Sequence, residues 1–460
     1  MESVPSPAIE LLPDRPSAEI RRGGASVRLA FDAPHPGEAL LFVNARAPAV
    51  DWARLGAECA LIRISIDGRH ASDLVVLSER KTTRGIALGH LDPGPHVVRF
   101  HFSDQSPPGA TRVMIDDPFV VHAIEGSEEE IALRHAPIIY GRSLPELGGP
   151  LQNTFTDAPV IAWHGNAIAS GGGRAIEYSA LWTHEDGGTD GPALMARWGR
   201  TTDIEWVYRV EVDERGHRIP GSAVFQGTGH EARAFRGVFE ADHPVLQTCT
   251  DNNMVDDRVD GELRFFLAAD ETLDAGRARE SVMERHPWIY AAMAGELSRE
   301  GRLCRWNGPE DPSLGDARGY LYLEFDAPPL RGAGSTEPLF AIGVRLAGDR
   351  QVYRSDRGLT ELALSARGPQ STAVRLPPGT RAEDIVEVSL HRVEGVSHRA
   401  GDIVVSDVMR MFLLDASYQP RRIRMRFPLP VRIGSLRRTA VLWSRLADPT
   451  ADLSRFGDPV

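Results

Sequence analysis

The sequence has few cysteines and no long apolar run, and both absences restrict what the chain can be. Its 460 residues include three cysteines, Cys59, Cys249 and Cys304, which lie far apart. They form neither a disulfide framework nor a zinc-ligand pattern. No apolar stretch approaches the roughly 20 residues of a membrane-spanning helix. We therefore expect no transmembrane segment.

The chain also lacks an excess of positive charge and a recognisable export signal. Lys and Arg total 52 against 64 Asp and Glu, which gives a net charge of −12. A nucleic-acid partner is not expected, because phosphate binding requires a basic surface. Residues 1–20 carry acids where a signal peptide has basic residues, and they lack a long apolar segment. We expect a cytoplasmic protein, or a secreted mature form whose signal has been removed.

Glycine and proline are abundant and separate many short apolar runs. The 44 Gly and 33 Pro alternate with β-branched and aromatic runs of strand length. This pattern favours a mainly β, multidomain protein with three β-sandwich-like domains and a short helical connector. The excess of arginine over lysine is typical of a bacterium with a GC-rich genome.

Shifts in these patterns divide the chain. Seven strand-like runs in about 100 residues are typical of an immunoglobulin-like sandwich, and a helical pattern interrupted by Pro287 is expected to connect two later parts. The tail includes a helix-like run at 436–448. The predicted parts are a lead segment (1–24), an immunoglobulin-like sandwich (25–126), a central sandwich (127–270), the helical connector (271–302), a C-terminal sandwich (303–430) and a tail (431–460).

Residues 197–213, RWGRTTDIEWVYRVEVD, predict a long strand that is entered from a polar turn. Side chains alternate between the two faces of a strand. Asp203 and Glu205 therefore project side by side, whereas Trp206 is expected on the apolar face. Adjacent carboxylates repel each other unless a cation neutralises them or one is protonated.

Further acids and histidines occur at the ends of neighbouring runs, in THEDGG at 183–188 and QGTGHEARAF at 226–235. Oxygen-rich clusters suit Ca²⁺, Mg²⁺ or Mn²⁺, and added imidazole would admit Zn²⁺. The alternative is a solvated cluster paired with Arg197 and Arg200. The predicted metal ligands are Asp186, Asp203, Glu205 and His230, and the predicted catalytic proton carriers are Glu185 and His184.

Three residues are candidates for contacting a bound ligand directly. Trp198 stands beside two arginines and is better placed than Trp206 to stack on a ligand. Arg200 would supply charge, and His243 could add an imidazole from the same block. The expected partner is a small molecule or a glycan.

The stretch 199–213 resembles the GHRHDWE heptapeptide, and the strand after it, of necrosis- and ethylene-inducing (Nep-like) proteins. In that family the heptapeptide opens a central strand of a β-sandwich, and its Asp and Glu help to bind a divalent cation. The resemblance covers about residues 134–268. It implies that Asp203 and Glu205 are these two ligands, with Asp186 as the upstream Asp and His230 as the downstream His.

The chain departs from the family pattern within the heptapeptide. Arg200 and Thr202 replace its histidines, and Ile204 replaces its Trp. Three possibilities remain, one of which is a purely structural role with no exchangeable ligand. The first is a divalent-cation-dependent protein, including a metal-dependent enzyme of the hydrolase or lyase type, in which the cation polarises a substrate oxygen or activates water. The second is a non-catalytic, cytolysin-like protein that binds a glycan or glycolipid.

Overall fold

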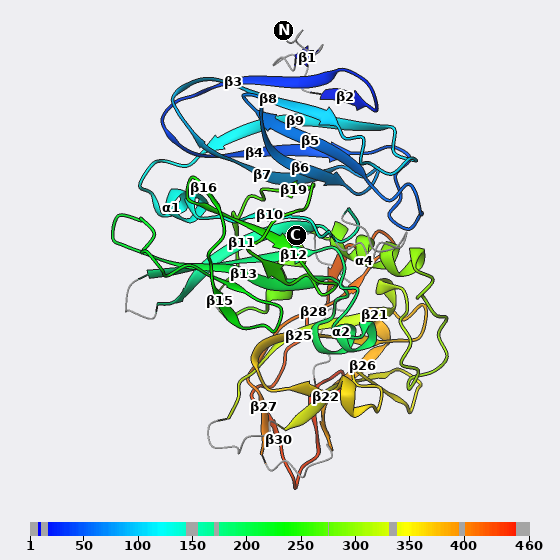
Figure 1. Ribbon diagram of the computed structural model, residues 1–460. Helices are drawn as coiled ribbons and strands as arrows, with labels where there is room; N and C mark the ends of the chain where they lie inside the picture. Colours follow the sequence, from blue (N-terminus) through cyan, green and yellow to red (C-terminus); the bar gives the residue numbers. More distant parts are fainter. Residues whose placement is uncertain are drawn as a thin grey trace. The chain divides into compact units, whose positions relative to one another are not determined.

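Strands predominate in the part of the chain that the computed structural model describes (Figure 1), namely residues 8–10, 17–143, 155–169, 174–274, 276–330, 338–394 and 401–447. Most of the predicted lead segment and the end of the predicted tail lie outside these residues. The chain is mainly β, as predicted. Its contacts divide it into two compact units: residues 1–188 with 202–272, and residues 189–201 with 273–460.

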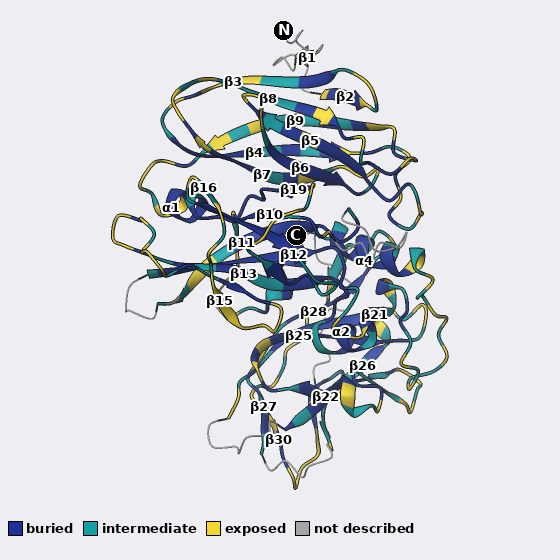
Figure 2. Ribbon diagram, in the orientation of Figure 1, coloured by how far each residue is buried: buried dark blue, intermediate teal, exposed yellow. Residues whose placement is uncertain are grey.

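The first unit begins with a two-sheet sandwich, here called the N-terminal sandwich. Its strands are β1 (Ala8–Glu10), β2 (Ser17–Arg21), β3 (Ser26–Ala33), β4 (Gly37–Arg46), β5 (Ala60–Ile66), β6 (Arg69–Val76), β7 (Thr82–Leu91), β8 (Gly94–Phe102) and β9 (Arg112–His122). One sheet has the order β1-β3-β8-β5-β6 and the other β2-β9-β4-β7. Both contribute to one apolar core that includes Ile20, Leu41, Ile62 and Phe100. Figure 2 shows this burial along β4, β5 and β6.

Two more sheets complete the first unit. Their elements, with one helix, are α1 (Glu128–Arg134), β10 (Ile138–Tyr140), β11 (Pro159–Ile168), β12 (Arg174–Trp182), β13 (Asp203–Val212), β14 (Val224–Gln226), β15 (Ala232–Ala234), β16 (Phe239–Glu240), β17 (His243–Thr248), β18 (Val255–Asp256), β19 (Arg264–Phe265) and β20 (Glu271–Thr272). The orders are β16-β17-β10-β19, with β18 on β17, and β15-β14-β13-β12-β11-β20. Leu40 and Ala87 of the N-terminal sandwich share a core cluster with Ile138, Val245 and Phe266. This shared core explains why both sets of sheets belong to one unit.

Strand β13 follows the predicted alternation except at one point. Ile204, Tyr208 and Val210 are buried as expected. Opposite β12, however, Tyr178 pairs with Tyr208 and Ser179 pairs with Trp206, so the residue between them is bulged. A bulge reverses the alternation locally. The prediction that Trp206 faces the core is therefore wrong: it is half-buried, and the Arg209 guanidinium lies 4.9 Å from its ring centroid.

Arg197 and Trp198, the first residues of the polar turn predicted before the strand, form the end of a helix instead. This helix, α2 (Gly191–Trp198), has Pro192 in its first turn and a left-handed Gly199 immediately after it. Proline at the start and glycine just past the end are helix-boundary signals. Residues 189–201 belong to the second unit. Trp198 and Arg200 are therefore in a different unit from the other predicted site residues.

The second unit contains the remaining helices and strands. They are η2 (Arg279–Ser281), α3 (Val282–Arg285), α4 (Trp288–Arg299), η3 (Ala317–Gly319), β21 (Tyr320–Ala327), β22 (Leu339–Leu346), β23 (Val352–Arg354), η4 (Thr360–Leu362), β24 (Leu364–Ser365), β25 (Gly368–Arg375), η5 (Ala382–Asp384), β26 (Ile385–Val393), β27 (Ile403–Val405), β28 (Asp407–Leu414), β29 (Pro420–Arg422), β30 (Val431–Ile433) and β31 (Thr439–Ser444). As the sequence indicated, α4 starts directly after Pro287. None of the described helices is long and apolar enough to cross a membrane.

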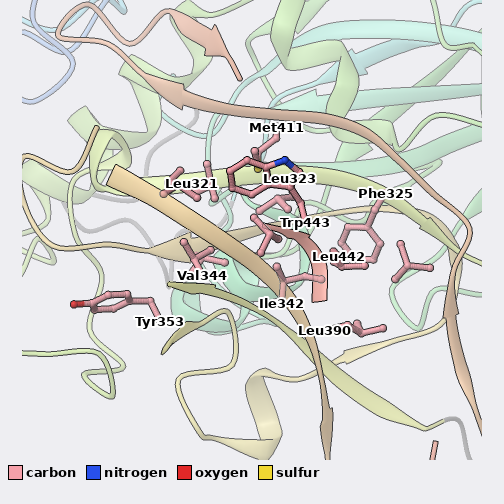
Figure 3. Close-up of a cluster of buried hydrophobic side chains, with 14 of the residues drawn as sticks. Leu321, Leu323, Phe325, Ile342, Val344, Tyr353, Leu390, Met411, Leu442 and Trp443 are labelled. Carbon is pink, nitrogen blue, oxygen red and sulfur yellow. The ribbon is translucent and has the colours of Figure 1, made fainter. Parts of the chain in front are cut away.

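Two main sheets of this unit enclose its core. Their orders are β25-β21-β28-β29 and β23-β22-β26-β31, with β24 on β22, while β27 and β30 pair separately. Leu323, Phe325, Ile342 and Trp443 are among the buried side chains that meet between them (Figure 3). The predicted helical run at 436–448 is wrong, because its middle forms strand β31 and pairs with β26.

Candidate functional site

The predicted acidic cluster in the first unit is built around an arginine. The Arg142 guanidinium forms ion pairs with Asp157 and Asp186, and the three side chains are at most 2% exposed. The Asp186 backbone N–H also donates to the carbonyl of Asp251 over 3.1 Å. Arg142 thus supplies positive charge at a place where the sequence predicts a metal cation.

The carboxyl groups of Asp157 and Asp186 share this one arginine. Burial raises the pKa of Asp157 well above its ordinary value, against the opposing attraction of Arg142, and the neighbouring Asp186 raises it further. Two adjacent carboxyl groups in a buried site favour retention of one proton. A protonated Asp157 leaves one negative charge on the pair, which Arg142 balances.

His184 and Asp203 lie beside this cluster. The His184 Nε2 is 3.9 Å from Oδ1 of Asp186, and both side chains are nearly fully buried. Asn253 donates from Nδ2 to the His184 carbonyl over 2.8 Å and to Oδ2 of Asp203 over 3.2 Å. Within the described part of the chain, the buried Oδ1 of Asn253 has no hydrogen-bond partner. Glu185, the other predicted catalytic residue, is also buried on this loop.

Glu205 and His230 have a different partner. The Gln226 amide nitrogen lies 2.9 Å from Oε2 of Glu205 and 2.9 Å from Nδ1 of His230. Among the described residues, no three of the four predicted metal ligands bring donor atoms within 4.8 Å of one another. The structure joins Glu205 to His230 through Gln226, and it places Asp186 with Arg142 and His184.

In the second unit, Trp198 lines a cavity of about 250 Å³. The cavity is formed by the end of α2, the residues around η2 and the segment that contains β24 and the start of β25. Among the described lining residues, four are arginines and one is an acid. The charged and aromatic side chains are Arg197, Trp198, Arg277, Arg279, Glu280 and Arg367.

Two of the charged lining residues are neutralised by partners outside the cavity. Arg277 donates to both carboxylate oxygens of Glu324 over 2.7 Å. Glu280 accepts from Arg200 over 3.2 Å, and the Arg200 guanidinium lies 5.6 Å from the Trp198 ring centroid. Arg200 is 3% exposed and does not line the cavity. Arg200 therefore contacts Glu280 and Trp198 from outside the cavity and supports their positions.

The other three arginines leave positive charge facing the cavity. Arg197 donates from Nη2 to the Glu361 carbonyl, while its buried Nε has no hydrogen-bond partner in the described structure. Burial and the nearby Arg367 lower the pKa of Arg197. Arg367 donates to the Ser365 hydroxyl over 2.9 Å, and no described carboxylate pairs with Arg279 or Arg367. Arg279 and Arg367 could not be predicted as site residues, because they are far apart in the chain and belong to no motif.

The third ligand candidate, His243, is buried in the first unit. Its Nδ1 lies 3.0 Å from the Ala136 carbonyl, and its Nε2 lies 3.4 Å from Oε2 of Glu38. The two side chains are 4% and 3% exposed. The side chain of His243 therefore contacts Ala136 and Glu38 and does not join Glu205 and His230 at Gln226. It lines a separate, smaller cavity.

Neither a family model nor a curated protein matches the chain. Among solved structures, it is similar to a β-glucosidase from Paenibacillus barengoltzii at 14% identity, over 25% of this chain and 11% of that one, with a TM-score of 0.15. It is also similar to tandem CBM51 modules of the family 98 glycoside hydrolase from Streptococcus pneumoniae at 10% identity, over 84% and 81% of the chains, with a TM-score of 0.16. Scores this low do not constrain fold or function.

Proposed function

We propose that the protein is a non-catalytic binding protein whose cavity at Trp198 holds a small saccharide carrying a carboxylate or sulfate group. The observation that carries this proposal is the set of Arg197, Arg279 and Arg367 around one cavity, none of which forms an ion pair with a described carboxylate, although Glu361 attracts Arg197 from nearby. In a chain of net charge −12, such a concentration of guanidinium groups favours an anionic ligand.

The chemistry of the lining supports this class of ligand. A guanidinium group presents paired N–H donors that match carboxylate or sulfate oxygens. A buried N–H without an acceptor is costly, and a ligand oxygen at Nε of Arg197 would remove that cost. The Trp198 indole offers an apolar face with a polar edge, which suits a sugar ring with both C–H and hydroxyl groups.

The size and acid content of the cavity favour binding over hydrolysis. Its volume of about 250 Å³ lies just below the ~300–1,000 Å³ of pockets for drug-sized ligands. Glycoside hydrolysis usually requires two carboxyl groups. Glu280 is the one acid among the described lining residues, and Arg200 neutralises it.

Calorimetric titration of the full chain tests the proposal. Glucuronate and glucose 6-sulfate are expected to bind, and glucose is expected to bind more weakly. Arg279→Gln should lower affinity for the acidic sugars by about tenfold or more, because a charge-assisted hydrogen bond contributes about 1.5–3 kcal/mol. Arg350→Gln, an exposed arginine outside the cavity, is the matched control. Equal affinity of wild type and Arg279→Gln would refute the assignment.

A second candidate function is divalent-cation binding beside His184 and Asp186. It is favoured by the 3.9 Å between Nε2 of His184 and Oδ1 of Asp186, and by the buried Oδ1 of Asn253 nearby. Imidazole and carboxylate donors together suit Zn²⁺ or Mn²⁺. Metal analysis of the purified protein is the test. If this site holds the metal, Asp186→Ala should lower metal content, whereas Glu205→Ala, which contacts Gln226 instead, should not.

A further inference from the structure

The first unit contains a second cavity, of about 60 Å³, which is separate from the acidic cluster. It is lined by residues from β6, β7, β10, β16 and β17 and by the two residues Arg264 and Phe266. A single water molecule needs about 10–15 Å³ of such cavity volume. The cavity therefore holds a few waters or a small ion, and it is too small for a sugar ring.

Gly89 opens the space in this cavity. A Cβ atom on Gly89 would lie 3.7 Å from Nη2 of Arg69 and 3.9 Å from Nε2 of His243, with the Phe266 ring edge 3.6 Å away. Two nitrogen atoms from different elements thus approach one point. Gly89 also has a φ of +82°, a conformation that favours glycine. The missing side chain leaves room that a small ligand can occupy.

Arg69 provides positive charge here without a carboxylate partner among the described residues. Its Nη2 donates to the Leu88 carbonyl over 3.2 Å, which leaves other N–H groups available. By contrast, Arg264 donates to both oxygens of Glu240, over 2.5 and 2.8 Å, and is neutralised by them. Arg69 is in no ion pair with a described carboxylate, and its charge also attracts the Glu240 carboxylate that lines the cavity.

His243 provides the second donor. Its Nδ1 faces the Ala136 carbonyl at 3.0 Å and therefore carries a proton. Its Nε2 is buried and makes no hydrogen bond within the described structure, although Oε2 of Glu38 lies 3.4 Å away. This Nε2 lies near both Glu38 and the point in the cavity that a Cβ atom on Gly89 would occupy.

A metal ion is a poorer match for the same groups. His70, His90 and Glu240 also line the cavity, and Asp73 lies 3.3 Å from Nε2 of His70. No three ligand atoms of the described residues around this cavity converge within 4.8 Å. An unpaired guanidinium also repels a cation. We infer that this cavity, with Arg69 and His243 as its main donors, binds a small oxyanion such as phosphate, sulfate or a short carboxylate.

The test is calorimetric titration of the full chain with inorganic phosphate, sulfate and acetate at constant ionic strength. Saturable binding is expected, and Arg69→Gln should weaken it by about tenfold or more, since a guanidinium–oxyanion pair is charge-assisted. Arg69 is exposed at the surface end of β6, so the variant should fold. The relative affinities of phosphate, sulfate and acetate identify the preferred anion.

Two control variants locate the binding. Arg46→Gln removes an exposed arginine at the end of β4, away from the lining residues, and should leave the affinity unchanged. Arg279→Gln should also leave it unchanged, which separates this site from the cavity at Trp198. Absence of saturable binding by the wild type, or equal binding by wild type and Arg69→Gln, would overturn the inference without affecting the saccharide proposal.

Discussion

The guanidinium group of Arg142 is buried against the carboxyl group of Asp157, with 2% and 0% of the two side chains exposed. The same guanidinium pairs with Asp186. Its removal would leave two buried carboxyl groups without their positive partner. Breaking a buried ion pair from one side costs about 3–5 kcal/mol.

Arg142→Met is therefore expected to lower the free energy of unfolding by about 3–5 kcal/mol. Chemical denaturation at pH 7 measures this loss of unfolding free energy. The control is Arg345→Met, which removes a surface pair with Glu387 whose side chains are 36% and 20% exposed. Surface pairs contribute about 0–1 kcal/mol. Equal losses in the two variants would contradict the buried role of Arg142.

The raised pKa of Asp157 predicts a dependence of stability on pH. A group whose pKa is higher in the folded state stabilises the fold below its unfolded pKa, and this contribution is lost as pH rises through the folded value. Burial is the main cause of the rise here. Asp157→Asn resembles the protonated acid and cannot ionise. The free energy of unfolding of the Asp157→Asn variant should therefore fall less than that of the wild type as the pH rises from 5 to 8.

Urea unfolding at several pH values measures this difference. Asp104→Asn, at an exposed position, should retain the wild-type pH profile. If Asp157→Asn also retained that profile, Asp157 would not be the group responsible.

A second pH effect is expected at the N-terminal sandwich. The hydrogen bond of Asp67 to His96, 2.6 Å from Oδ2 to Nδ1, raises the pKa of His96, and the Asp92 carbonyl adds to the rise. The resulting stabilisation is present below the unfolded histidine pKa of about 6.5 and is lost as pH rises through the folded value. Asp67→Asn should therefore destabilise the protein at pH 5.5 more than at pH 8.5. Thermal unfolding tests this, with the exposed His101→Gln as control.

Neighbouring positions on β31 should differ sharply in their tolerance of substitution. Leu442 is fully buried in the core shown in Figure 3, whereas Val441 is 44% exposed. Leu442→Ala should cost about 2–5 kcal/mol, because it leaves a cavity. Val441→Ala should stay within about 0.5 kcal/mol, as is usual for surface positions. Similar losses of unfolding free energy in the two variants would contradict the burial of Leu442 and the exposure of Val441 on this strand.

The β-rich character of the fold was predictable because strand burial leaves a local period of two. Tyr208, Val210 and Val212 are buried for that reason. Trp206 was misplaced because a bulge depends on the register with β12, which the sequence of one strand does not record. The α2 helix was missed although Pro192 and Gly199 mark its two ends.

The candidate sites were less predictable because their charges are balanced across long sequence separations. Asp186 and Asp203 were identified from local clustering, but the partners Arg142 and Asn253 come from other segments. Trp198 was predicted as a ligand contact from its two neighbouring arginines, and it lines a cavity. Two further arginines of that cavity, Arg279 and Arg367, are separated by nearly ninety positions and have no shared pattern.

The chain leaves the first unit after β12 and returns to it at β13, and Trp182 pairs with Asp203 at that point. The excursion carries α2, whose Ala196 carbonyl accepts from the Thr372 hydroxyl of β25 over 2.5 Å. A protease cut between residues 272 and 273 would therefore not release a complete second unit. The fragment beginning at Leu273 would lack one of its own helices, which would stay covalently attached to the other fragment.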